Sequence, residues 1–292
     1  MIFKKMSELS ADDMVSLWNK GFEGYFINST LNLDKFLSRT VNEELSLEHS
    51  LVVYENSEPI GFVMNGFRVI EGKKVAWNGG TGIAAEHRGK GIGKKLMERN
   101  LQLYREQGVD IALLEALIQN EAAKKLYQSV GYDITEQLIC LQHTETLDAS
   151  LLQPNAPSRY VTKRGLPVEV KGLSFYRHLS AWQTQWASMK DGECIFISDE
   201  EDEVVGYALF KRVFGEDGNL ATIALYQCES IPGRADAVNI LKAVLSEVYA
   251  PFFSSCKRMT MNIRDSNKEL IGVLERLGFT TFVEQVHMIR HL

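Results

Sequence analysis

The stretch of sequence that decides the fold joins an expected strand to an expected helix and reads Gly82-Ile83-Ala84-Ala85-Glu86-His87-Arg88-Gly89-Lys90-Gly91-Ile92-Gly93-Lys94-Lys95-Leu96. The glycines at 89, 91 and 93 can take a positive φ, so successive backbone N–H groups can turn toward one point. The start of the helix adds unsatisfied N–H donors and a partial positive charge. With the basic side chains around it, the loop predicts a site for a phosphate or pyrophosphate.

Two familiar nucleotide-binding motifs come close to this loop, and both are rejected. Gly80-x-Gly82-x-x-Ala85 has the spacing of the dinucleotide fingerprint, but the expected helix opens only after Arg88. A Walker loop needs Ser or Thr after Gly-Lys, whereas Gly93-Lys94 is followed by Lys95. A merely flexible turn would leave the alternating glycines and the basic helix start unexplained.

Hydrophobic periodicity around the loop predicts alternating helices and strands through the first half of the chain. We expect strands at residues 50–54, 59–69, 74–84 and 111–118, with a final strand pair through 132–144. We expect helices at residues 10–22, 33–39, 91–107 and 121–129. Ser10, followed by Asp12 and Asp13, is typical of a helix N-cap with acidic residues in the first turn.

The second half repeats features of the first at a nearly constant offset. Two expected strands surround a turn before Gly61, and the pattern returns around Gly206, 145 residues later. The end of a short helix at Gly131 returns at Gly278, 147 residues later. These repeats predict a duplicated domain. Three prolines near residue 160 and the lack of an apolar period predict a linker at 149–165, between domains at 1–148 and 166–292.

Composition and charge exclude several classes of protein. Hydrophobic residues make up 45% and charged residues 24%, as in ordinary globular proteins, and the net charge is −6. An acidic chain has no global cationic field, so we expect neither nucleic acid nor an anionic membrane as partner. No apolar run approaches a membrane span of roughly 20 residues, and the N-terminus lacks the apolar core of a signal peptide. The four cysteines and six histidines do not cluster, so we expect no metal site and a cytoplasmic location.

Two motifs together resemble those of one known family. The run Arg88-Gly89-Lys90-Gly91-Ile92-Gly93 is similar to the Q/R-x-x-G-x-G/A signature of the GNAT family, the acyl-CoA-dependent N-acetyltransferases. Asn120, Leu126-Tyr127 and Gly131-Tyr132 follow in the order and spacing of that family's second motif. The resemblance is clear over roughly residues 50–135. It implies an α/β (α+β) fold of two tandem GNAT-like domains, each a mixed, mostly antiparallel sheet with flanking helices.

The resemblance implies acetyl-CoA as the acyl donor. Its pyrophosphate would lie on the amides of residues 88–93, its pantetheine arm along the strand that ends the motif, and Asn120 on the other side of the arm. A backbone N–H near Ile83 would stabilise the oxyanion. The residues expected to bind the cofactor are Ile83, Ala84, Ala85, Arg88, Gly89, Lys90, Gly91, Ile92, Gly93 and Asn120.

Acetyl transfer to an amine needs a proton donor for the thiolate and an acceptor for the amine proton. Tyr127 lies two helical turns after Asn120, at the position of the family's acid, and a phenol can donate a proton. Its alternative role is that of a core tyrosine closing the short helix. Glu115 is the candidate base, acting through water. Alternatively, Glu115 orients another group or serves as a structural hydrogen-bonding residue.

The expected activity is acetyl-CoA-dependent N-acetylation of a primary amine on a small molecule or peptide, by direct attack in a ternary complex. Acidic and aromatic residues in the acceptor region, Glu23, Tyr25 and Phe26, could attract a cationic amine, although a solvated acidic loop would look the same. A second hypothesis is an acyl-CoA sensor without turnover, which would have no need of a proton donor. The acceptor and the acyl chain length stay open.

The second half lacks the glycines that characterise the cofactor-binding loop of the first half. In alignment with the first half, Asp236 and Val238 stand where Gly91 and Gly93 are, and both residue types suit a pyrophosphate poorly. Leu274 replaces the phenol of Tyr127. We therefore expect a degenerate GNAT-like domain with a role in structure, acceptor recognition or dimerisation. Trp182 and Trp186, spaced like a helical turn, are expected to mark a core face.

Overall fold

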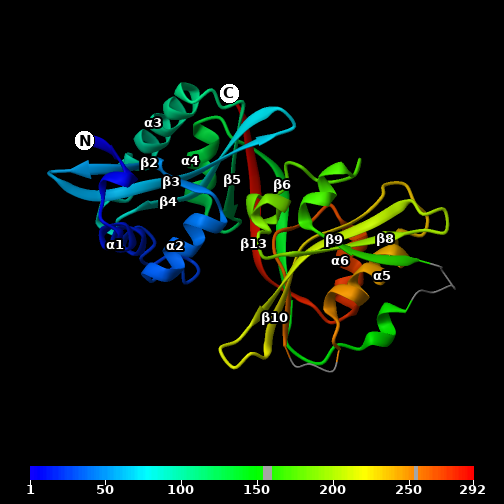
Figure 1. The fold of residues 1–292 in the computed structure, drawn as a ribbon. Coiled ribbons are helices and arrows are strands. Elements are labelled where there is room, and N and C mark those ends of the chain that lie inside the picture. The colour runs from blue at the N-terminus through cyan, green and yellow to red at the C-terminus, as the bar shows by residue number, and fades with distance from the viewer. Residues whose placement is uncertain (154–159, 253–255) are drawn as a thin grey trace. The chain divides into compact units, whose positions relative to one another are not determined.

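The chain forms two compact units, seen in a computed structural model that describes residues 1–153, 160–252 and 256–292 (Figure 1). The first unit contains Met1–Thr135 and Val286–Leu292, and the second contains Glu136–Gln285. The end of the chain therefore belongs to the first unit. The continuous domains at 1–148 and 166–292 stay a prediction, and the centre of the expected linker lies outside the described residues.

The sheet of the first unit is antiparallel over four strands and then turns parallel. β1 to β4 pair in chain order, and β5 runs parallel to β4. The two turns between β2, β3 and β4 place Asn56, Ser57, Glu71 and Gly72 at positive φ, as type I′ hairpin turns require. β13 follows β5 in the sheet order. The strands are β1 (Ile2–Lys5), β2 (Leu45–Glu55), β3 (Glu58–Ile70), β4 (Lys73–Ile83), β5 (Ile111–Leu117) and β13 (Thr280–His291).

Helices cover both faces of this sheet, with α3 on one side and α1 and α2 on the other (Figure 1). The predicted cap is confirmed, because the Ser10 side chain accepts a hydrogen bond from the Asp13 N–H. Apolar residues of α3 pack into a buried cluster with α4 and the sheet. The helices are α1 (Ala11–Gly21), α2 (Leu33–Asn42), α3 (Ile92–Glu106) and α4 (Glu121–Ser129), with short 3-10 turns η1 (Met6–Glu8) and η2 (Ala85–His87).

The second unit repeats this architecture. β7 to β10 are antiparallel in chain order, and β11 runs parallel to β10. Asn120 and Asn267 cap α4 and α6 with nearly the same φ and ψ, −85° and 70° against −84° and 68°. Gly131 and Gly278 both have φ of +86°. The elements are η3 (Ala149–Leu152), β7 (Val161–Gly165), η4 (Pro167–Gly172), η5 (Trp182–Thr184), η6 (Trp186–Ser188), β8 (Glu193–Ser198), β9 (Val204–Phe214), β10 (Leu220–Ser230), α5 (Ala237–Tyr249), β11 (Lys257–Thr260), β12 (Ile263–Arg264) and α6 (Lys268–Arg276).

Two local predictions are wrong. Residues 132–144 form one strand, β6 (Asp133–His143), and not a strand pair, because partners for residues 138–143 come from β11 and β12. The tryptophans at 182 and 186 lie on two short 3-10 turns and not on one helix. Trp182 is nevertheless fully buried, whereas Trp186 is only partly buried.

Candidate active site

The candidate site lies where β4 and β5 separate. Their parallel ladder ends at the pair Asn78 and Leu114, although β4 continues to Ile83 and stays paired with β3. The register between β3 and β4 shifts at Gly79, and the Gly79 carbonyl accepts a hydrogen bond from Arg39. Such a bulge bends a strand locally. The edge of β4 beyond the ladder thus faces β5 across a widening gap.

The glycine-rich loop has a positive φ at two of its three glycines, whereas Gly93 lies within α3. Gly89 and Gly91 have φ of +75° and +76°, and Gly91 is the N-cap of α3. Lys95 N–H donates to the Gly91 carbonyl, which makes the N–H groups just before Lys95 the first turn of the helix, whose donors have no partner within it. A Cβ on Gly93 would lie 3.2 Å from Leu126, so this glycine lets α3 begin close against α4.

Arg88 anchors the loop to the protein. Its guanidinium donates to the carbonyls of Ile83 at 2.8 Å, Gly21 at 3.0 Å and Glu23 at 2.7 Å. Its own N–H donates to the carbonyl of Ala85. Arg88 therefore ties the loop to the ends of β4 and α1. Because its guanidinium already donates to three carbonyls, its predicted contribution to cofactor binding would come mainly from its positive charge.

The structure brings together three residues that the sequence assigned to separate roles. Asn120 caps α4, accepting from the Ala123 N–H at 3.1 Å, and it also hydrogen-bonds with the hydroxyl of Tyr25. Tyr127 is 8% exposed. Burial raises the pKa of Tyr127 to about 12, although hydrogen bonding with Thr81 and Asn78 opposes the shift. Burial also raises the pKa of Tyr25. Both phenols therefore keep their protons at neutral pH.

Glu115 and Tyr127 lie on opposite faces of β5. Leu114 and Ala116 belong to the same buried cluster as Tyr127, and alternate residues of a strand point to opposite faces. The Glu115 carboxylate accepts a hydrogen bond from the indole N–H of Trp77 at 2.7 Å, and its other oxygen lies 3.1 Å from Nδ1 of His287. The carboxyl group is thus held in a defined orientation on the face of the sheet that Trp77 shares.

A second carboxyl group lies near Glu115 on this face. Glu43 follows α2 and pairs with Arg39 at 2.8 Å. Burial and the charge of Glu115 raise the pKa of Glu43, whereas Arg39 and Arg68 lower it. These residues and His287 were not predicted from the sequence. For Arg39 and Glu43, the four-residue helical spacing was an available signal, whereas His287 lies 172 residues from Glu115 and carried none.

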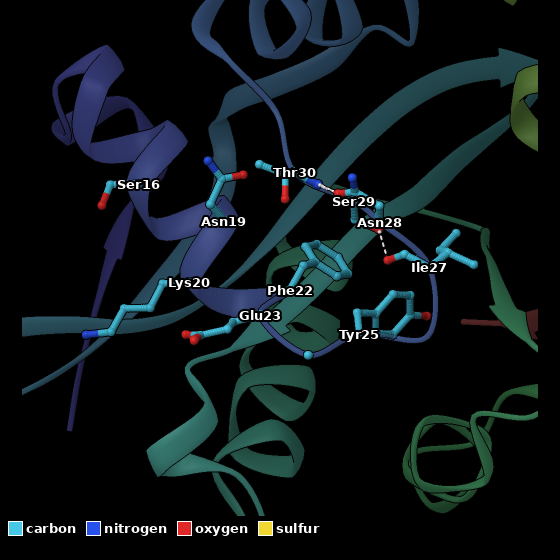
Figure 2. A pocket seen from close by; sticks show the side chains of 11 residues that line it. Ser16, Asn19, Lys20, Phe22, Glu23, Tyr25, Ile27, Asn28, Ser29 and Thr30 are labelled. Atoms are coloured by element: carbon cyan, nitrogen blue, oxygen red, sulfur yellow. Dashed lines mark hydrogen bonds between the residues drawn. The ribbon is translucent and has the colours of Figure 1, made fainter.

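The expected acceptor residues only partly line one cavity. A cavity of about 510 Å3 follows the end of α1 and the next loop, and Figure 2 shows its side chains. Glu23 and Tyr25 line it, whereas Phe26 is 56% exposed and stacks edge-on against Tyr25 outside the lining. The cavity is lined by Ser16, Asn19, Lys20, Phe22, Glu23, Gly24, Tyr25, Ile27, Asn28, Ser29 and Thr30.

In the second unit, ion pairs occupy the corresponding positions. Arg234 binds both oxygens of Asp236, at 2.8 and 2.9 Å, and also Asp199 at 2.8 Å. The cavity beside them, about 370 Å3, is lined by Tyr160, Asp199, Glu200, Glu201, Glu203, Arg234 and Asp236. Five carboxyl groups against one guanidinium would repel a pyrophosphate.

The gap between the parallel strands of the second unit is bridged in the same way. The ladder of β10 and β11 ends at Leu225 and Thr260. Beyond it, Arg264 lies 3.0 Å from both oxygens of Glu229. Leu274, at the position of Tyr127, is fully buried.

Comparisons with known proteins agree with this geometry. Residues 4–132 match the model of the acetyltransferase (GNAT) family. The L-amino acid N-acyltransferase MnaT of Escherichia coli is 30% identical over 89 residues, which are 30% of this chain and 52% of that protein. N-alpha-acetyltransferase 30 of Schizosaccharomyces pombe is 31% identical over 86 residues, 29% of this chain and 57% of that protein. The chain thus spans little more than half the length of these relatives.

Solved structures extend the likeness in fold to the whole chain. A tandem GNAT protein from the clavulanic acid biosynthesis pathway aligns with a TM-score of 0.62 at 14% identity, over 99% of this chain and 98% of that one. A GCN5-related N-acetyltransferase from Sphaerobacter thermophilus aligns with a TM-score of 0.67 at 14% identity, over 99% of this chain and 95% of that one.

The fold and motifs of the first unit are similar to those of N-acyltransferases. Residues 4–132 carry the sequence pattern of the GNAT family of acetyltransferases. The fold class predicted from the sequence is confirmed, with two GNAT-like units in tandem. In the part of the chain that the structure describes, no helix is long and apolar enough to cross a membrane.

Proposed function

We propose that the first unit is an acetyl-CoA-dependent N-acetyltransferase that acts on a primary amine of a small molecule or peptide. The observation that carries the proposal is that Glu115, the first residue of β5 after its ladder with β4 ends, points to one face of the sheet, whereas Tyr127 of α4 packs against the other face. A thioester lying between the strands would have a proton donor on one side and a carboxylate on the other.

The cofactor would bind through backbone groups. The N–H groups at the start of α3 would hold the pyrophosphate, with positive φ at Gly89 and Gly91 turning further amides toward it. Lys90 is exposed on this loop and would add positive charge. The pantetheine arm would pair with the free edge of β4 near Ile83, and Asn120 would contact it from the start of α4. Ala84 is turned away, since its N–H donates to the Ile60 carbonyl.

The reaction would release one proton. The ammonium group loses a proton to Glu115 through water, and that proton goes on to solvent. The neutral amine then attacks the thioester carbon, the new N–C bond forms, and the C–S bond breaks. The sulfur takes the proton of Tyr127, and the nitrogen returns its second proton to the phenolate. The products are the amide and the free thiol of CoA.

The high pKa of Tyr127 constrains the timing of this step. A thiol has an ordinary pKa of about 8.5, so complete transfer from a phenol with a pKa of about 12 to a thiolate would be uphill by itself. The phenol therefore donates a hydrogen bond to the departing sulfur, and its proton moves in concert with loss of the proton from nitrogen. This keeps charge from building up on a buried phenolate.

The acceptor would approach from the face that carries Glu115. The printed names of two relatives describe transfer to L-amino acids and to α-amino groups, which makes these the first amines to test. Glu23 and Tyr25 in the cavity at the end of α1 would attract a cationic amine.

We propose no cofactor site in the second unit, because carboxyl groups line the place of the phosphate loop. Its role would be structural, in acceptor recognition or in dimerisation.

The test is release of CoA, followed with a thiol reagent, when the protein is mixed with acetyl-CoA and a panel of L-amino acids, peptides and polyamines. The proposal expects amine-dependent release and an acetylated product by mass spectrometry. Tight acetyl-CoA binding without release on any amine would contradict it and favour a sensor. Propionyl-CoA and longer thioesters in the same assay would define the acyl length.

A further inference from the structure

A histidine near the end of the chain lies against the candidate base. His287 is on β13, in the segment that belongs to the first unit. Val286 and Met288, on either side of it, join the buried cluster that contains Tyr127. By strand alternation, His287 therefore points to the opposite face, which is also the face of Glu115.

The contact between the two side chains is short and buried. Nδ1 of His287 lies 3.1 Å from Oε1 of Glu115, and their side chains are 4% and 5% exposed. The backbone of the histidine is fixed as well, since the Thr135 hydroxyl donates to its carbonyl at 3.2 Å. Trp77 donates to the other oxygen of Glu115 at 2.7 Å. The carboxylate is thus held from both sides by groups of the protein.

Such a pair has a definite chemical consequence. When Nδ1–H donates to the carboxylate, it stabilises the ionised form of Glu115, which is the form that can accept a proton. It also fixes the imidazole tautomer and the plane of the carboxylate.

We infer that His287 is a positioning residue for acetyl transfer, holding Glu115 ionised and turned toward the incoming amine. The inference rests on the proposed function. It makes the end of the chain part of the active site of the first unit, although the motifs of that site all lie between residues 80 and 132.

Other charged groups face the same carboxylate. Glu43 interacts electrostatically with Glu115, and Arg39 and Arg68 in turn act on Glu43. Removing the donor of His287 disfavours the ionised carboxylate, whose neighbour Glu43 also carries a carboxyl group. The direction of the expected effect is therefore fixed: as the pH falls, the variant loses activity at a higher pH than the natural protein does.

The test compares three variants of the full chain. His287→Ala removes the donor. His287→Asn keeps an N–H group near the position of Nδ1 but does not titrate near neutral pH. His291→Ala is the matched control, because His291 is on the same strand, with the same alternation, and is exposed. For each protein, kcat, KM for the amine, the dissociation constant of acetyl-CoA and the pH profile of kcat/KM are measured.

We expect His287→Ala to lower kcat/KM at least tenfold at pH 7, to leave acetyl-CoA affinity within about twofold, and to move the acidic limb of the profile to higher pH. His287→Asn should recover much of the loss, and His291→Ala should match the natural protein. An unchanged profile in His287→Ala would overturn the inference. If His287→Ala and His287→Asn lose the same activity and the same stability, His287 has a structural role only, and this result would also overturn the inference.

Failure of the inference and failure of the proposed function are distinguishable. If the natural protein turns over and His287→Ala is unaffected, the inference fails and the function stands. If the natural protein acetylates no amine, the function fails and the positioning role falls with it. In that case, an imidazole titration of His287 by NMR that changes in Glu115→Gln would show a structural pair without a catalytic role.

Discussion

The indole nitrogen of Trp77 lies 2.7 Å from the Oε2 atom of Glu115, and this hydrogen bond joins β4 to β5 at the end of their ladder. Trp77 is paired with Leu113, and the last pair of the ladder contains Leu114. The indole of Trp77 therefore reaches past the last pair to Glu115, the next residue of β5. The carboxylate is therefore fixed where the two strands begin to separate, and the Trp77 side chain links the strands at that point.

Replacing Trp77 by Phe should weaken both the fold and the reaction. A hydrogen bond to a charged group contributes about 1.5–3 kcal/mol, and the smaller ring leaves a void. We expect a lower urea midpoint and a severalfold fall in kcat/KM, with acetyl-CoA affinity nearly unchanged. Trp186→Phe, a change at a partly buried tryptophan of the second unit, is the control. If Trp77→Phe keeps the kcat/KM of the natural protein, Glu115 does not need the hydrogen bond from Trp77 for activity.

Tyr127→Phe should separate chemistry from binding. Loss of a general acid costs about 10²–10⁴ in rate, whereas the ring and its packing remain. We expect kcat to fall by that range and the dissociation constant of acetyl-CoA to change less than twofold by calorimetry. Tyr132→Phe is a matched control, because Tyr132 is a nearby buried phenol whose hydroxyl has no hydrogen-bond partner among the described residues. An equal loss of binding and rate in Tyr127→Phe would indicate a core tyrosine.

Gly91→Asp should abolish cofactor binding. The residue has φ of +76° with open space around its Cβ position, so the substitution strains the backbone by about 1–2 kcal/mol and brings a negative charge to the expected phosphate site. We expect at least a hundredfold loss of acetyl-CoA affinity. Gly72→Asp, at φ of +75° in a hairpin turn and also with open space, imposes the same backbone strain elsewhere. If the two variants bind acetyl-CoA with equal affinity, the phosphate site does not lie on this loop.

Much of the first unit's site was predictable because its parts are local in sequence. The loop at 88–93 and the cap at Asn120 each need only a few neighbouring residues, and Tyr127 follows its cap by two turns. The strand that replaced the expected pair at 132–144 was not predictable, since its partners lie near residue 260. The contact of Glu115 with His287 was hidden for the same reason. Phe26 lies outside the lining of the cavity that Glu23 and Tyr25 share, and this could not be predicted because an exposed aromatic and a cavity residue look alike in sequence.

The ion pair of Arg234 with Asp236 should give the second unit a stability that depends on pH. Hydrogen bonding with Arg234 lowers the pKa of Asp236 from 3.8 to about 2. A lowered folded-state pKa means that the contribution is complete above about pH 4 and is lost as the pH falls through 2. Since both side chains are about a third exposed, we expect Arg234→Ala to cost about 1 kcal/mol or less.

This difference is measured by urea unfolding at pH 7 and near pH 2. The natural protein and Arg234→Ala should differ at pH 7 and converge near pH 2, and 1 M salt should shrink the difference at pH 7. A difference that persists near pH 2 would show that Arg234 acts through packing and not through charge.

The position of bound acetyl-CoA tests the central claim most directly. A crystal structure of the complex should place the diphosphate on the amides at the start of α3, with the sulfur within hydrogen-bond distance of the Tyr127 hydroxyl and one cofactor in each chain. A diphosphate beside Arg234 in the second unit, or a thioester away from Tyr127 and Glu115, would contradict the account.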